Sequence, residues 1–556
     1  MRARLSLDFR GSPHFTSNRT TVEGHSSGVA GRAAGQQRRA RRSVLNPLVL
    51  GVLMLLAAAV YATFALYRFY QFNSGTYDLG IFDQAIDSYA HFQPGISLIK
   101  GLHNGFGSHF SILGDHFSPI LALLAPLYWI YNGPQDLLIA QAVLLTLAIP
   151  PLWVFTRRAL GGGTRGTAAA YLASVAYALS WPVAAAVSFD FHEVAFAPGL
   201  TALAFERLQA GRPRAALLAL GGLLLVKEDM GLLVAGAGLV LLVSRRRLSR
   251  QRLVGAALII AGLAAAVTAL YVLIPAMGGR SDYYFAYGAF GRNMPQALWH
   301  IATDPARTLR MLVTPRTKLD TLIWLFGAFG FLPLLSPITL AAVPLLLERM
   351  LSSSAANWWG VLFHYNAFLV VVVVLGAVDG GVRLGRWVAA AGARPASPIR
   401  SSPPAPAGAL AGNVALGAAG LLCAMAIMFV PKSAFDAAFR PGFFDVTTPQ
   451  ISAERAAVEA VPSGVTVAAA NKLGPHLVAR DSVILWDGNG STPPLLAPWV
   501  VATTSEVQFT FSTIAQEQTG RDSVAFLEQH GYRVVFDRLG YYVLHRGDLP
   551  ARHGKS

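Results

Sequence analysis

Apolar residues fill most of the chain between residues 44 and 430, in long runs that short polar turns interrupt. Most of these runs approach the length at which an α-helix crosses about 30 Å of hydrocarbon. The sequence lacks the alternating segments of about ten residues that are typical of a transmembrane β-barrel. The pattern predicts a polytopic α-helical membrane protein with about 11 spans. The predicted apolar helices cover residues 44–67, 135–155, 167–187, 194–208, 215–226, 230–243, 253–274, 319–335, 337–350, 366–378 and 408–430.

One apolar run, residues 117–131, differs from the others in length and composition. It would form only about four helical turns, and Pro119 and Pro126 interrupt it. Such a run suits a helix in the membrane interface better than one that crosses the bilayer. We therefore expect interfacial helices at the first outer loop, residues 69–116, and directly after it.

The two ends of the chain lack the long apolar runs. Residues 1–43 are rich in Gly, Ser and Arg and show no hydrophobic periodicity, which predicts a disordered tail. Residues 431–556 instead combine short strand-like runs with helical stretches, which is typical of a small α/β domain. In this domain we expect strands at 464–470, 482–486, 499–503 and 532–545 and helices at 451–460 and 522–530.

Composition supports the membrane assignment and limits the partners. With 54% hydrophobic residues, 13% charged residues and a mean hydropathy of +0.46, this is no ordinary soluble protein. A net charge of +16 is also typical of nucleic-acid binding, but the arginines cluster beside apolar runs, so no nucleic acid is expected. The positive-inside rule places the N-terminus in the cytoplasm and the loop 69–116 and the domain 431–556 outside. The single cysteine, Cys423, excludes an intrachain disulfide.

This topology gathers acidic residues and histidines at the outer ends of the predicted spans. Ionisable side chains so close to hydrocarbon are costly and tend to mark functional sites. In the first outer loop, Asp78 is the leading catalytic candidate, as a general base for a sugar hydroxyl, and Asp83 is the second. On a helix these two side chains would point about 140° apart, so we expect different roles, with Asp83 structural. The alternative is that both are solvated or capping residues.

Two further groups lie at the outer ends. Asp115 and His116 begin the apolar segment 117–131, either as substrate contacts or as ordinary helix caps. Asp190 and Glu193 would share a helical face, with His192 between them, and carboxylates of this kind are candidate ligands for Mg²⁺ or Mn²⁺. The same residues could equally bind no metal. His192 is also a candidate substrate contact.

Charges and aromatic residues at two other outer ends complete the set of candidates. Lys227, Glu228 and Asp229 interrupt an otherwise apolar run. Lys227 would neutralise a phosphate headgroup, with the two acids as further substrate contacts. Alternatively, the three form an internal pair that makes buried charge tolerable. His364 and Tyr365 either contact an anionic headgroup or belong to an aromatic belt at the interface.

Six short motifs follow one another in a fixed order along the chain. They are YDLGIFDQ at 77–84, GDHFSP at 114–119, DFHE at 190–193, KED at 227–229, NKLGPHL at 471–477 and GYRVVF at 531–536. This series resembles the bacterial membrane-protein family known as domain of unknown function 2079, over about residues 44–546. That family has been grouped with the GT-C glycosyltransferases, which use polyprenyl-phosphate-linked sugars on the outer face of the membrane.

The resemblance implies a GT-C-like fold, with paired short helices in the first outer loop and an acidic catalytic residue there, the place of Asp78 or Asp83. It implies a glycosyltransferase of the bacterial plasma membrane that moves a sugar from a polyprenyl-phosphate-linked donor to a cell-envelope acceptor. Two other functions stay open. The protein could be a transporter or flippase for a lipid-linked or polar solute, or a non-catalytic membrane scaffold.

Overall fold

The structure is a computed structural model, which describes residues 28–243, 250–392, 407–486, 497–504, 522 and 524–547. Its first helix, α1 Gly28–Tyr70, begins inside the predicted disordered tail, so that prediction is wrong for residues 28–43. The physical reason is composition, because Ala, Gln and Arg are good helix formers and this stretch continues directly into an apolar run. Residues 1–27 of the predicted tail lie outside the described residues.

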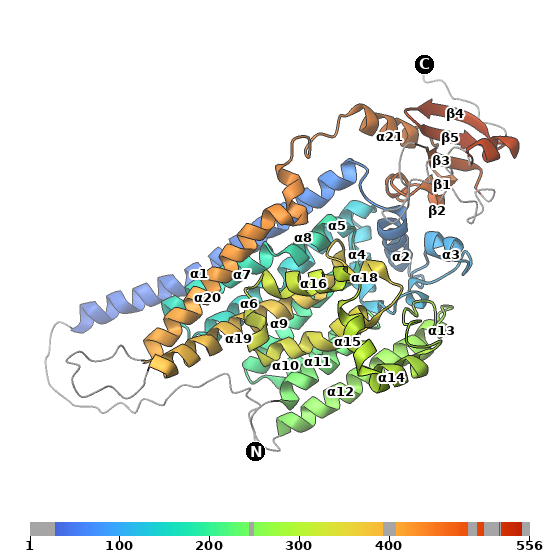
Figure 1. Cartoon of the computed structure of the whole chain (residues 1–556). Coiled ribbons are helices and arrows are strands. Elements are labelled where there is room, and N and C mark those ends of the chain that lie inside the picture. Colours follow the sequence, from blue (N-terminus) through green and yellow to red (C-terminus); the bar gives the residue numbers. More distant parts are fainter. Residues whose placement is uncertain are drawn as a thin grey trace.

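Within these ranges, six helical segments are long and apolar enough to cross a membrane, and they belong to one bundle (Figure 1). This confirms the expected multi-pass helical membrane protein. Two of the segments bend near prolines, at 147–148 and at 179–180, where one helix ends and the next begins. The six segments are Asn46–Tyr70, Pro134–Ala159, Gly163–Ser188, Arg250–Ala276, His364–Gly392 and Gly408–Lys432.

The predicted count of about 11 spans is not confirmed. Three predicted spans fold as α9 Phe196–Gln209, α10 Pro213–Leu223 and α11 Met230–Leu242, with 14, 11 and 13 residues. At 1.5 Å per residue such helices cover only about 17–21 Å, less than the hydrocarbon thickness. Their apolar residues pack in the core of the bundle. The prediction failed because an apolar run can be buried against protein as well as exposed to lipid.

The remaining helices between residues 134 and 276 follow the predicted order. The two bent segments consist of α5 with α6 and of α7 with α8, and the segment from Arg250 continues without a gap through three elements. These helices are α5 Pro134–Thr146, α6 Ile149–Ala159, α7 Gly163–Ala178, α8 Trp181–Ser188, η4 Glu193–Ala195, α12 Arg250–Thr268, η5 Ala269–Leu273 and α13 Ile274–Ala276.

The first loop and the segment after it fold into short helices. The apolar run 117–131 becomes a ten-residue helical stretch, Pro119–Tyr128, which is too short to cross the bilayer, as expected. The elements are η1 Thr76–Gly80, α2 Ile81–Ala90, α3 Leu98–His103, η2 Ile112–Gly114, η3 Pro119–Leu124 and α4 Ala125–Tyr128.

The segment 276–318, predicted as a long polar loop, contains two helices, α14 Met294–Thr303 and α15 Pro305–Val313. Both begin with a capping side chain, because Asn293 accepts from the N–H of Gln296 and Asp304 accepts from the N–H of Arg307. The predicted break at Ser336 is confirmed. The chain then runs through α16 Arg316–Gly327, η6 Leu332–Leu335, η7 Pro337–Ala342, α17 Val343–Leu351, α18 Ala356–Trp359, η8 His364–Asn366, α19 Ala367–Gly392 and α20 Ala407–Phe429.

The C-terminal part folds into an α/β domain around a five-stranded sheet with the order β2-β1-β3-β5-β4. Strand β1 pairs in parallel with β2 and β3, and β5 pairs antiparallel with β3 and β4. Each predicted strand is observed, and 532–545 forms two. The elements are η9 Val430–Lys432, η10 Ala434–Phe439, α21 Pro449–Glu459, β1 Thr466–Ala470, η11 Gly474–His476, β2 Ser482–Trp486, β3 Trp499–Thr503, β4 Arg533–Arg538 and β5 Tyr541–His545.

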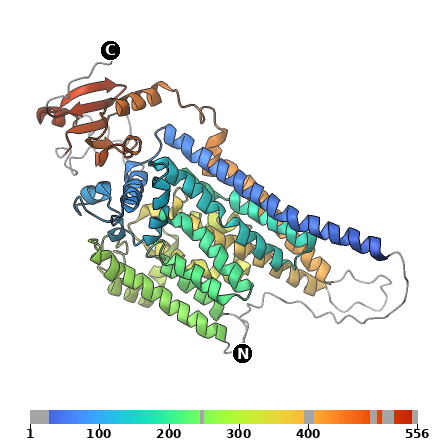
Figure 2. The same ribbon diagram turned by 180° about the vertical axis from the view of Figure 1, so that it is seen from behind.

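The sheet domain and the first loop share one hydrophobic core. Figures 1 and 2 place α2 and α3 between the end of the helical bundle and the sheet. Leu79 and Ile99 from the loop belong to the same buried cluster as Val467 of β1 and Leu485 of β2. The first loop is therefore packed between two folded parts of the protein and is not a solvated linker.

Candidate functional site

Asp78 lies in η1, the π-helical turn that opens the first loop, and 31% of its side chain is exposed. Its Oδ1 atom is 3.7 Å from Nε2 of His192, which comes from the segment between α8 and η4. The two residues are far apart in sequence, and the fold brings them together. Helix α2, which directly follows η1, lies at the end of the bundle next to the sheet domain (Figure 1).

Three contacts hold His192, two through its ring and one through its backbone. Its Nδ1 is 2.9 Å from the carbonyl oxygen of Asp190, and its backbone N–H donates to Oε1 of Gln141 at 3.1 Å. The ring stacks on that of His364, with 3.7 Å between the ring centroids. Because a carbonyl oxygen only accepts, Nδ1 must carry a proton, and Nε2 is the nitrogen that faces Asp78.

The carboxylate of Asp190 points to the backbone of the first loop. Its Oδ2 atom accepts a hydrogen bond from the N–H of Gly75 at 2.6 Å, three residues before Asp78. Burial, and then the neighbouring charge of Asp78, raise the pKa of Asp190 to about 6. Asp190 therefore fastens the loop that carries Asp78.

Lys227 lies in the turn between α10 and α11 and is almost completely buried. Burial alone would lower the pKa of Lys227, but the charges of Asp229, Glu193 and Glu228 outweigh burial and raise it. Among the described residues, the nearest carboxylate oxygen to its ammonium is Oε1 of Glu193 at 3.6 Å, beyond hydrogen-bond distance. Neither carboxylate oxygen of Glu193 has a hydrogen-bond partner among those residues either. A buried cation and a buried anion thus keep unused hydrogen-bonding capacity.

His116 and Glu228 form an ion pair that ties the segment 117–131 to the same turn. Nδ1 of His116 is 2.8 Å from Oε1 of Glu228, and the N–H of Phe117 donates to the other carboxylate oxygen at 3.1 Å. Burial and the charge of Lys227 lower the pKa of His116, but the charges of Glu228 and Asp115 and the hydrogen bond to Glu228 together outweigh both and raise it. The candidates at 116 and 228 are therefore direct neighbours.

Asp115 binds a lysine that sequence reasoning missed. Its Oδ1 atom is 2.9 Å from Nζ of Lys100 and accepts a hydrogen bond from the hydroxyl of Tyr284 at 2.7 Å. Lys100 also donates to the hydroxyl of Tyr77, next to Asp78, at 3.1 Å. The capping alternative for Asp115 finds no support, because η3 has no side-chain cap. The available signal was that Lys100 is the only Lys or Arg between residues 69 and 116.

The turn that carries His364 and Tyr365 is fixed by a second residue that sequence reasoning missed, Arg349 of α17. Its guanidinium donates to the carbonyl of Tyr365 at 2.6 Å and to Oδ1 of Asn366 at 3.1 Å. The ring of His364 lies against that of Tyr365, with 4.3 Å between the centroids, and stacks on that of His192. Glu193, which lies 3.6 Å from Lys227, directly follows His192 in the chain, so the histidine pair, Lys227 and Asp78 belong to one cluster.

Asp83 has a different set of partners. It is 1% exposed, and its Oδ1 atom accepts a hydrogen bond from the hydroxyl of Tyr128 in α4 at 2.6 Å. Burial raises the pKa of Asp83 to about 7, although this hydrogen bond acts in the opposite direction. These contacts agree with a structural role, because the pair fastens α2 to α4.

The predicted metal site gains no support from the geometry. Residues 189–192 are not helical, so Asp190 and Glu193 do not share a helical face. Asp190 binds the backbone of Gly75, and Glu193 lies beside Lys227. In the part of the chain that the structure describes, no group of three or more His, Cys, Asp or Glu residues is placed to hold a metal ion. Binding of Mg²⁺ or Mn²⁺ stays a prediction, and no chemical step is assigned to it.

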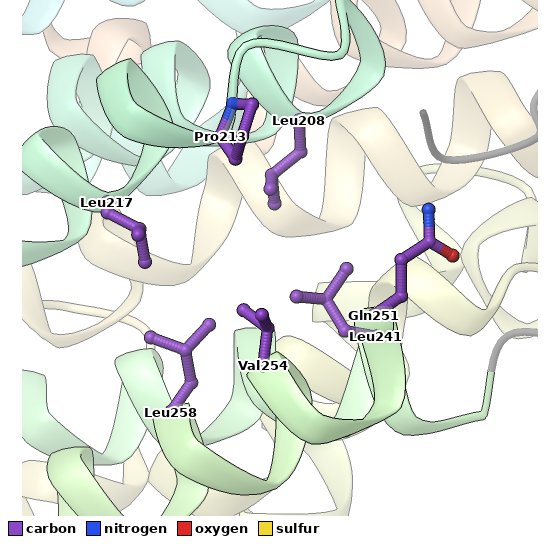
Figure 3. Close-up of a pocket in the computed structure, with 7 residues that line it drawn as sticks. All are labelled: Leu208, Pro213, Leu217, Leu241, Gln251, Val254 and Leu258. Carbon is purple, nitrogen blue, oxygen red and sulfur yellow. The ribbon is translucent and has the colours of Figure 1, made fainter. Parts of the chain in front are cut away.

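A pocket between α9, α10, α11 and α12 has different chemistry. Figure 3 shows Gln251 as the one amide side chain among apolar side chains such as Leu208, Leu217 and Leu258. No candidate residue lines this pocket, and a sugar phosphate requires several polar partners. The candidate site is therefore the cluster around Asp78, His192, His364 and Lys227.

Comparison with known sequences gives one result. The sequence model of the family described as "Predicted membrane protein (DUF2079)" matches residues 68–543, which include all the candidate site residues. No curated protein matches the chain.

Three solved structures resemble the fold. ArnT from Cupriavidus metallidurans in the apo state is 12% identical, with a TM-score of 0.48, over 92% of this chain and 100% of that chain. ArnT from the same organism bound to undecaprenyl phosphate is 12% identical, with a TM-score of 0.43 and coverages of 90% and 99%. The oligosaccharyltransferase of Archaeoglobus fulgidus in the apo form is 13% identical, with a TM-score of 0.32 and coverages of 81% and 70%. At these low TM-scores the likeness carries no argument about function, so a function can be inferred only from the chain's own residues.

Proposed function

The chain belongs to DUF2079, the family of predicted membrane proteins whose sequence model it matches, and for this member we propose a glycosyltransferase function. The protein would move a sugar from a polyprenyl-phosphate-linked donor to a cell-envelope acceptor. One observation carries the proposal. An accessible carboxylate, Asp78, and a protonated lysine without a hydrogen-bonded counterion, Lys227, surround the same region together with the His192–His364 pair.

Asp78 is the proposed general base. Its exposed carboxylate would take a proton from the acceptor's hydroxyl group, whose oxygen then forms a bond to the anomeric carbon of the donor sugar. Nε2 of His192, at 3.7 Å, lies beside this carboxylate and would help to orient it. The buried contacts of Asp190 and Gln141 hold the loop of Asp78 and the backbone of His192 in place, so the base needs little reorganisation during the reaction.

Lys227 is the proposed contact for the leaving phosphate. When the bond between the anomeric carbon and the phosphate oxygen breaks, its electron pair stays on the phosphate, and negative charge develops there. A buried ammonium without a hydrogen-bonded partner stabilises such charge more strongly than a solvated one. Glu193, Glu228 and Asp229 keep Lys227 protonated through their charge.

An apolar groove beside this cluster is the proposed site for the prenyl chain of the donor. The groove lies between α15, α16, η7 and α17, and its lining includes Leu312, Phe326, Val343 and Met350. Helix α17 connects the two sites, because Met350 lines the groove while the preceding Arg349 fixes the turn of His364. The isoprene units of the donor would pack against these apolar side chains, in place of the lipid tails that the units would otherwise contact in the membrane.

The proposal places the site on the outer face of a bacterial plasma membrane. Arginines support this orientation, because Arg212 follows the far end of α9, whereas His192, the neighbour of Asp78, lies just before the chain enters η4 and α9. Arg158, in the last turn of α6, lies at the same far end, where it forms an ion pair of 2.8 Å with Glu206 in the last turn of α9. Under the positive-inside rule this end is cytoplasmic, so the site and the sheet domain lie outside.

The test is a transfer assay with the full-length protein in lipid vesicles. Undecaprenyl-phosphate-linked sugars, with the label in the sugar, are supplied together with extracted envelope material. We expect the label to leave the lipid fraction with the wild-type protein and to stay there with Asp78→Asn. Movement of intact labelled lipid across the bilayer, without cleavage, would instead favour a flippase.

A further inference from the structure

The sheet domain contacts the loop that carries Asp78 through the turn after β1, residues 471–476. Strand β1 lies between β2 and β3, its two parallel partners, and this turn follows its carboxyl end. In parallel sheets, the carboxyl ends of the strands are where ligands and functional partners are usually bound. Here that position is occupied by the start of η1, from the membrane part of the same chain.

The first N–H groups of η1 are satisfied from outside the helix. A helix start leaves its first N–H groups without intrahelical partners, and the N-cap residue Gly75 has no side chain to supply one. The N–H of Thr76 donates to the carbonyl oxygen of Asn471 at 2.6 Å, and the N–H of Tyr77 donates to the Oδ1 atom of Asn471 at 2.9 Å. Together with the bond from Gly75 to Asp190, three successive N–H groups before Asp78 have partners from distant segments.

The packing around this contact leaves little room for movement. The hydroxyl of Thr76 donates to the carbonyl oxygen of Asn471 at 2.7 Å. A Cβ atom placed on Gly474 would lie only 2.1 Å from Oγ1 of Thr76, so a glycine is required at this close approach. The ring of His476 lies between those of Phe69 and Phe72, with centroid distances of 4.2 and 3.9 Å, which fastens the same turn to the end of α1.

We propose that Asn471 is a positioning residue for Asp78, and that the sheet domain supplies the N-terminal cap of the turn that carries the catalytic carboxylate. The amide side chain orients the N–H of Tyr77, and the backbone that follows places Asp78 opposite His192. The sheet domain is thereby part of the site, although Asn471 itself does not touch the substrate. What Asp78 does in the reaction rests on the proposed function, whereas the cap itself does not.

Hydrogen exchange of the full-length protein tests the cap without any assay of activity. Loss of the side-chain acceptor in Asn471→Ala should speed exchange in the peptide that contains residues 75–80 by about tenfold. Asn471→Asp keeps an Oδ1 acceptor and should retain the wild-type rate. Gln450→Ala, an amide truncation in α21 of the same domain, should leave this peptide unchanged. Unchanged exchange in Asn471→Ala, or faster exchange throughout β1, β2 and β3 as well, would overturn the proposal.

The transfer assay supplies a second readout. A misplaced base slows the chemical step more than donor binding, so Asn471→Ala should lower kcat by about ten- to a hundredfold with KM for the lipid donor little changed. An unchanged kcat would contradict the positioning role. If the wild-type protein transfers no sugar at all, the proposed function fails, while the exchange rates still decide whether Asn471 caps the turn.

Discussion

Asp78 and Asp83 lie five residues apart in one motif, and their carboxylates have opposite surroundings. Asp78 is on a π-helical turn, with 31% of its side chain exposed and the ring of His192 beside it. Asp83 lies on the following α-helix, 1% exposed and bonded to the hydroxyl of Tyr128. An accessible carboxylate can exchange a proton with a substrate, whereas a buried carboxylate bonded to tyrosine holds two helices together.

The difference comes from the partners that reach each side of the loop. The Asp78 side meets the segment of His192 and the turn of Asn471, both distant in sequence. The Asp83 side meets α4, which follows directly after the same loop. One short motif therefore joins the accessible face of Asp78, which we propose to be reactive, to the buried, structural face of Asp83.

The largest expected effect is on the Asp78 side. Asp78→Asn removes the base and should lower the rate of sugar transfer by about 10²–10⁴-fold, without loss of folded protein. Asp83→Asn keeps an acceptor for the hydroxyl of Tyr128 and should retain most of the activity. Rates measured for both variants at equal amounts of folded protein check this, and an equal loss in the two would remove the distinction between the faces.

The second prediction concerns Lys227, the proposed phosphate contact in the same cluster as Asp78. Lys227→Met removes the buried charge that is proposed to contact phosphate and should weaken binding of undecaprenyl phosphate by about ten- to a hundredfold. Lys227→Arg keeps the charge and should retain part of the affinity. Titration of the lipid into each detergent-solubilised variant gives the dissociation constants. Equal affinity in all three proteins would rule out the phosphate contact.

The structural face has its own pH dependence. Because the pKa of Asp83 is raised from 3.8 to about 7, the folded protein keeps a proton that the unfolded chain releases at lower pH. This stabilisation is complete below pH 3.8 and is lost as the pH rises through about 7. Between about pH 5 and pH 8, the wild-type melting temperature should therefore fall more than that of Asp83→Asn. Parallel melting curves for the two proteins would contradict the raised pKa.

The smallest expected effect concerns the apolar groove beside α17 and the pocket of Figure 3. Val343→Trp partly fills the groove beside α17 and should raise KM for the lipid donor by several-fold, on the order of 1 kcal/mol, while kcat changes little. Leu217→Trp places the same bulk in the pocket of Figure 3 and serves as the matched control, with KM unchanged. Equal kinetics for the two variants would exclude the groove as the donor's site.

The local pattern was sufficient for much of the fold. Apolar runs identified the six long membrane segments, and short strand-like runs identified the five strands that the structure describes in the sheet domain. It was not sufficient for the number of spans, because α9, α10 and α11 carry the same apolar composition while being too short to cross the bilayer. Nor did it detect the helix at 28–43, where arginines and alanines read as a tail.

By itself, the sequence supplied the candidates for the chemistry, because a carboxylate or lysine at the end of an apolar run is costly and tends to mark a functional site. It supplied Asp78, His192 and Lys227 as candidates, and the motif around Asn471 as one of those that resemble the family. Only the tertiary structure decided which of them meet. Lys100 reaches Asp115, Asn471 reaches Tyr77, and Tyr128 reaches Asp83, because these contacts depend on how separate segments pack and leave no local pattern.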